Sequence, residues 1–180
     1  MVQVSALCRQ LKKGEIIKKN TNAYKTTITA IIGALYVALG LIFSAISFGP
    51  IQVRLSATLY QLVPYNKKYF WALILGTAIL NVFSPLGWYD MVFGVATSAV
   101  GLGVAVGLNH FVKNMNAKRI ITALSVSAST VFVAWELVLV AHVPFFATWL
   151  TVATGQLIAQ VAGMLLMAGI NKRVNLSKAI

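Results

Sequence analysis

Long apolar runs separated by short breaks fill residues 26–172, and this pattern constrains the fold more than any other feature. Inside a bilayer every backbone polar group must find a partner within the protein, so apolar runs of this length are expected to cross it as helices. We therefore predict an all-α integral membrane protein with six transmembrane helices. The predicted spans are residues 26–48, 51–63, 69–83, 88–112, 120–141 and 145–170.

The composition supports this assignment and argues against nucleic acid as a partner. Hydrophobic residues make up 59% of the chain and charged residues 10%, whereas soluble domains carry about 25% charged residues. The net charge is +12, but the lysines and arginines lie in loops and tails, where they act as topology signals and contact lipid headgroups. A lone Cys8 implies no disulfide and no metal cluster.

The positions of the basic residues predict the orientation. Outside the predicted spans, lysine and arginine occur in residues 1–25, 67–68, 113–119 and 172–178, and the loops near Gly49, Pro85 and Pro144 hold none. By the positive-inside rule, both termini are then cytoplasmic. We predict a basic N-terminal segment (1–25), a membrane domain (26–172) and a cytoplasmic tail (173–180) of a multi-pass protein in a prokaryotic plasma membrane.

The short helix predicted over residues 51–63 differs from the other spans in length and polarity. Pro50 and Pro64 bound it, and a helix of this length extends only about 20 Å. It carries Gln52 and Arg54 between apolar runs. Such a helix is expected to line a wet cavity rather than face lipid on all sides.

Polar and aromatic side chains gather in the outer half of the predicted bundle. Charged groups inside spans usually face a cavity or a partner, so an outward-facing substrate pocket is predicted. Its candidate residues are Gln52, Arg54, Trp88, Tyr89, Asp90, Glu136 and Gln156.

Several of these candidates have a second explanation. Arg54 could extend to the lipid headgroups, and Asp90 could cap the helix that it begins. Glu136 should either pair with Arg54 or contact a ligand, and Trp88 could belong to an interfacial aromatic belt.

Small residues recur every four positions in the first span. Ala30, Ala34 and Ala38 lie on one helix face, where they permit close approach of another helix. The spacing alone leaves open whether that helix belongs to this chain or to a partner.

The sequence shows no catalytic machinery. It contains no phosphate-binding loop, no H-E-x-x-H zinc motif and no G-x-S-x-G nucleophile motif. We predict that the protein is not an enzyme and requires no cofactor or metal.

Four segments carry a resemblance to a known family: ISFGPIQVRLSATLYQLVPYNKKY, NVFSPLGWYDMVFGVATS, WELVLVAHVPFFATWLTVATGQL and KRVNLSK. Together they resemble the QueT family, which are S components, the substrate-binding subunits of energy-coupling-factor (ECF) vitamin transporters. The resemblance implies a membrane coupling subunit and two cytoplasmic ATPase subunits as partners, and an S component that topples in the bilayer to deliver its substrate. It also implies that Ala30, Ala34 and Ala38 dock on the coupling subunit.

The chain departs from the family pattern at two positions that bear on the substrate. Ala57 and Gln156 stand where similar proteins tend to have glutamate. A carboxylate is the best hydrogen-bond acceptor for the N–H edge of a 7-deazaguanine queuosine precursor. From this loss we hypothesise cobalamin or a related corrinoid as the substrate, with a queuosine precursor as the alternative. A stand-alone channel or assembly protein is a remote third possibility.

Overall fold

The computed structural model describes residues 21–44, 54–174 and 176–177. Most of the predicted N-terminal segment, as well as Gln52, lies outside these residues. The described residues form helices and no strands, as predicted. The helices are α2 (Thr21–Ile42), the 3₁₀-helix η2 (Leu55–Leu62), α4 (Tyr69–Val82), α5 (Trp88–Phe111), α6 (Met115–Ser129), α7 (Val131–Ala141) and α8 (Phe145–Arg173).

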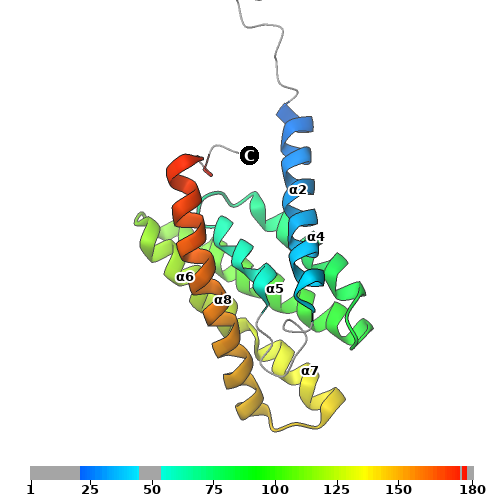
Figure 1. The fold of residues 1–180 in the computed structure, drawn as a ribbon. Helices are drawn as coiled ribbons and strands as arrows, with labels where there is room; N and C mark the ends of the chain where they lie inside the picture. The colour runs from blue at the N-terminus through cyan, green and yellow to red at the C-terminus, as the bar shows by residue number, and fades with distance from the viewer. Residues whose placement is uncertain (1–20, 45–53, 175, 178–180) are drawn as a thin grey trace, which may run out of the picture.

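The helix η2 lies in the middle of the bundle, in contact with α2, α4, α6 and α8 (Figure 1). Every residue from Ser56 to Leu62 is buried. Its eight residues rise only about 16 Å at ~2.0 Å each, so the described helix is shorter and more tightly wound than the predicted helix over 51–63. Such a short segment is tolerated at membrane depth because protein surrounds it on all sides.

Within the described residues, three helical segments are long and apolar enough to cross a membrane. They are α5, the combined stretch of α6 and α7, and α8, whereas the apolar parts of α2 (Thr26–Ile42) and α4 are shorter. This arrangement agrees with a multi-pass membrane protein. The number of crossings and the side on which the termini lie stay predictions.

The predicted span over 120–141 is divided into α6 and α7 at Thr130, which the sequence analysis did not anticipate. The Thr130 hydroxyl donates to the Ser127 carbonyl at 2.6 Å, and the Ser129 hydroxyl donates to the Val126 carbonyl at 2.8 Å. Hydroxyls that bond back to preceding carbonyls compete with the regular helical ladder. The apolar periodicity continues through the break, so hydropathy alone does not reveal it.

One glycine permits the closest approach between η2 and α8. A Cβ atom at Gly163 would meet the carbonyl oxygen of Thr58 and would lie 2.8 Å from its Cα atom. Because these are backbone atoms, no rotamer change can relieve the contact. Glycine at this position therefore lets α8 lie directly against the central helix.

The basic segments of the chain meet at one end of the bundle. The Asn66 side chain donates to the Ser177 carbonyl at 3.2 Å, and the Tyr69 hydroxyl donates to the Leu176 carbonyl at 2.9 Å. Arg119, at the start of α6, donates to the Tyr65 hydroxyl. The loop after η2, the beginning of α6 and the C-terminal segment are thus brought together, as positive-inside loops would be.

Candidate substrate-binding site

A buried ion pair joins the beginning of η2 to the first turn of α5. Nη2 of Arg54 donates to Oδ1 of Asp90 at 2.8 Å, and the two residues are 7% and 1% exposed. Asp90 also lies where a helix favours negative charge. Both groups are held inside the protein, so Arg54 does not extend to the headgroups.

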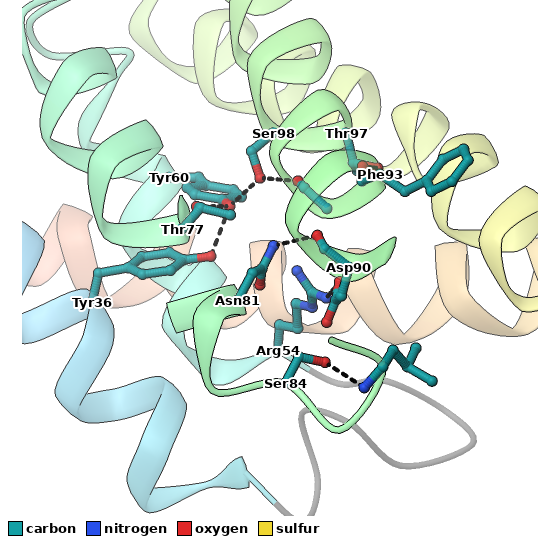
Figure 2. Close-up of polar contacts among 12 residues, drawn as sticks. Tyr36, Arg54, Tyr60, Thr77, Asn81, Ser84, Asp90, Phe93, Thr97 and Ser98 are labelled. Carbon is teal, nitrogen blue, oxygen red and sulfur yellow. Dashed lines mark hydrogen bonds and ion pairs between the residues drawn. The ribbon is translucent and has the colours of Figure 1, made fainter. Parts of the chain in front are cut away.

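Asn81 and Gly94 support the carboxylate from neighbouring positions. The Asn81 side chain donates to the Asp90 carbonyl at 2.8 Å (Figure 2). A Cβ atom at Gly94 would lie 2.7 Å from Asp90 Oδ1 and would also meet Asn81 Nδ2. Neither residue was predicted from the sequence, because an asparagine and a glycine in apolar helices carry no pattern that points to Asp90.

Glu136, on α7, is fully buried and lies within electrostatic range of Asp90 and Arg54. Both of its carboxylate oxygens lack a hydrogen-bond partner among the described residues, as does Oδ2 of Asp90. The predicted pairing of Glu136 with Arg54 is therefore not formed. A buried carboxylate without a partner is costly, and its oxygens are available to a ligand.

A small hollow of about 20 Å³ lies beside this charged group. Residues of five helices line it, namely η2, α5, α6, α7 and α8, together with Arg54 before η2 and Thr130 at the α6–α7 break. Its lining consists of Arg54, Tyr60, Thr97, Ser98, Val126, Thr130, Val133, Val152 and Gln156. Since small-molecule sites typically measure ~300–1,000 Å³, the hollow is nearly closed.

A cluster of four hydroxyl groups reaches the hollow through Tyr60 and Ser98. The Tyr60 hydroxyl makes hydrogen bonds with those of Tyr36 (2.7 Å), Thr77 (2.9 Å) and Ser98 (2.7 Å), which connects η2 to α2, α4 and α5 (Figure 2). The rings of Tyr36 and Tyr60 stack with centroids 5.5 Å apart. The sequence analysis missed both tyrosines, although a tyrosine within an apolar span is itself a signal of a buried polar contact.

The remaining predicted site residues lie apart from this group. Trp88 and Tyr89 are exposed and pack against each other, with ring centroids 4.8 Å apart, and neither lines the hollow. Ala57 is fully buried in the apolar core and does not line the hollow either. Ala57 is thus a core residue in this structure.

The first-span alanines occupy an open groove elsewhere on the bundle. Ala30, Ala34 and Ala38 are exposed on α2, while Gly33 on the same helix is buried against α4. A groove of about 660 Å³ runs between α2 and α4, and all three alanines line it. The alanine face is thus not used for packing within the described part of the chain.

Comparison with known proteins shows which family the chain belongs to. A model of the QueT transporter family matches residues 26–172. The chain belongs to the QueT transporter family. It is 36% identical over 169 residues to a protein of Lactococcus lactis subsp. cremoris (strain MG1363) called queuosine precursor transporter QueT, covering 89% of this chain and 99% of that protein. No solved structure matches the chain.

Family membership confirms two predictions, that the protein is not an enzyme and that it lies in the cell membrane. A QueT transporter is not an enzyme, in agreement with the lack of catalytic motifs. Together with the three long apolar helical segments, it makes this chain a multi-pass protein of the cell membrane. The comparisons favour the queuosine-precursor alternative and give no support to the corrinoid hypothesis.

Proposed function

We propose that this QueT-family chain is the substrate-binding S component of an ECF transporter and captures a queuosine precursor of the 7-deazaguanine type. The observation that carries the proposal is the buried, unpaired carboxylate of Glu136 beside the Arg54–Asp90 ion pair. The name of the Lactococcus lactis relative supports the same substrate class.

The chemistry of the charged group suits such a ligand. A 7-deazaguanine presents an amidine-like N–H edge, which a carboxylate accepts through two parallel hydrogen bonds. Glu136 has two oxygens for that edge, and Asp90 keeps Oδ2 for an aminomethyl cation. The amide of Gln156, which lines the hollow, can meet the remaining polar atoms of the base.

The same arrangement supports a queuosine precursor over a corrinoid. The lack of glutamate at Ala57 and Gln156 does not deprive the site of carboxylates for a cationic, N–H-rich ligand. Asp90 and Glu136 supply two carboxylates from α5 and α7 instead. Two carboxylates suffice for one amidine-like edge and one ammonium group.

Ligand binding in this proposal requires the helices to separate. A hollow of about 20 Å³ holds about one water molecule, so a bicyclic base enters only when α5, α7 and α8 move apart. The break at Thr130 between α6 and α7 offers a place for this movement, because the regular helical ladder is already interrupted there.

The partners and the orientation belong to the same proposal. The exposed face of Ala30, Ala34 and Ala38 is offered as the docking site for the membrane coupling subunit, which two cytoplasmic ATPase subunits drive. We infer six crossings with both termini cytoplasmic, which agrees with the basic segments meeting at one end of the bundle.

Calorimetric titration of the purified protein with an aminomethyl-7-deazaguanine tests the substrate. We expect tight binding, and we expect Glu136→Gln to weaken it about 10–150-fold, as loss of a charged hydrogen bond worth ~1.5–3 kcal/mol requires. Glu15→Gln, which removes the carboxylate of the basic N-terminal segment, is the matched control and should bind as the parent does. Tight binding of cobalamin, with no response to the deazaguanine, would overturn the substrate assignment.

A further inference from the structure

A polar hollow of about 480 Å³ opens at the basic end of the bundle, away from the candidate substrate site. The loop after η2, the end of α5 and the beginning of α6 enclose it. Its polar lining includes Tyr65, Lys67, Asn109, His110 and Lys118. Lys67 is exposed and Lys118 is half-buried, so the hollow presents two ammonium groups.

These cations have no acidic counterpart nearby in the described part of the chain. The whole sequence contains three acidic residues, Glu15, Asp90 and Glu136, and the two described ones belong to the substrate site. Arg119 adds positive charge beside the hollow, since its guanidinium lies 5.2 Å from the Tyr65 ring centroid. The electrostatic complement of this hollow is therefore an anion.

An apolar hollow of about 310 Å³ adjoins the polar one and shares Lys67 and Val106 with it. Phe70 and Trp71 of α4 line it, with ring centroids 5.2 Å apart. The Trp71 side chain is 66% exposed. A tryptophan beside lysines is typical of the boundary between lipid tails and headgroups.

Two glycines of α5 keep both hollows open. Gly103 lines the apolar hollow and Gly107 the polar one, four residues apart on the same helix face. A Cβ atom at either position would meet nothing within 4 Å. At these two positions α5 contributes no side chain to the hollows, and a side chain added there would begin in open space.

We propose that one anionic phospholipid binds here. Its phosphate lies between Lys67 and Lys118, and the first part of an acyl chain follows Phe70, Trp71 and Gly103. Basic pockets at the cytoplasmic edge of transmembrane helices suit such headgroups. A free phosphate would need only the polar hollow, whereas the adjoining apolar hollow calls for an acyl chain.

Native mass spectrometry of the delipidated protein, titrated with phosphatidylglycerol, tests the proposal. We expect one lipid bound per chain, with retention about five-fold lower for each lysine lost in Lys67→Gln and Lys118→Gln. Gly103→Leu should also lower retention, by occupying the acyl-chain position. Lys113→Gln with Lys172→Gln is the matched control, because it removes the same charge from residues that line neither hollow.

The other outcomes decide against the proposal. Equal retention in the lysine variants and the control would mean that the lipid responds only to net charge. Binding of inorganic phosphate that is sensitive to Lys67→Gln, with lipid retention unchanged in Gly103→Leu, would assign a phosphate site instead. Deazaguanine binding by each variant verifies that the bundle is folded, since none of these residues belongs to the substrate site.

Discussion

Arg54 and Asp90 lie 36 residues apart in the sequence, and Nη2 of Arg54 donates to Oδ1 of Asp90 at 2.8 Å inside the bundle. Arg54 immediately precedes η2, and Asp90 lies in the first turn of α5. The pair therefore determines where the central helix begins relative to α5. The second oxygen of Asp90 has no hydrogen-bond partner among the described residues.

Replacing Asp90 with asparagine should destabilise the protein and abolish substrate binding. The change leaves the Arg54 guanidinium buried without its counter-charge, and breaking a buried pair in this way costs about 3–5 kcal/mol. Thermal unfolding in detergent, followed by tryptophan fluorescence, measures the loss. The double variant Arg54→Met with Asp90→Leu is the control, because an apolar pair should recover most of the stability but none of the binding. Equal stability of Asp90→Asn and the parent would contradict the burial of this pair.

Removal of the Tyr60 hydroxyl should weaken the packing of four helices at once. Its hydrogen bonds reach Tyr36, Thr77 and Ser98 on α2, α4 and α5. Tyr60→Phe keeps the ring stack and is expected to cost about 1–3 kcal/mol, because buried hydroxyls lose their shared partner. Tyr36→Phe removes one of these hydrogen bonds and should cost less. Denaturation of both variants under the same conditions shows which of them loses more stability. A larger loss of stability in Tyr36→Phe than in Tyr60→Phe would refute the central role of Tyr60.

Alanine at Gly163 should disturb the contact between α8 and η2. The new Cβ atom would lie 2.8 Å from Thr58 Cα, and overpacking against a backbone costs about 1–3 kcal/mol. Gly169→Ala, on the same helix, is the matched control, since its Cβ would meet nothing within 4 Å. That substitution should be neutral or slightly stabilising, because alanine is the better helix former. Melting temperatures that fall equally in both variants would show that Gly163 does not set the helix spacing.

Leucine at Ala34 should block transport while substrate binding persists. Ala34 is exposed in the α2–α4 groove, and a larger side chain there prevents the close approach that small residues allow. Uptake of labelled precursor by cells that express the ATPase and coupling subunits measures the effect, and calorimetry measures binding. Ala128→Leu is the matched control, because it places the same side chain on an exposed position of α6, away from the groove, and it should leave uptake unchanged. Normal uptake by the Ala34→Leu variant would show that the alanine face is not the docking site. Uptake in cells that lack the ATPase subunits would favour a channel instead.

Sequence reasoning predicted the all-helical membrane class and the candidate charged residues, because apolar runs and isolated charges are local signals. It placed Arg54, Asp90, Glu136 and Gln156 in the membrane, and the structure buries all four. It offered Glu136 as a partner for Arg54, whereas the structure pairs Arg54 with Asp90. Pairing depends on the distances between helices, which hydropathy does not encode.

The sequence by itself determined that this chain crosses a membrane, where its basic segments lie along the chain, and to which family it belongs. Only the tertiary structure decided that Arg54 pairs with Asp90 and that Glu136 has no partner among the described residues. It also decided that Ala57 packs in the core and that Ala34 faces outward. The reason is physical. The free energy of moving a residue into the bilayer depends on that residue and its neighbours in sequence, whereas the energy of a buried charge depends on which atoms three-dimensional packing brings within a few ångströms.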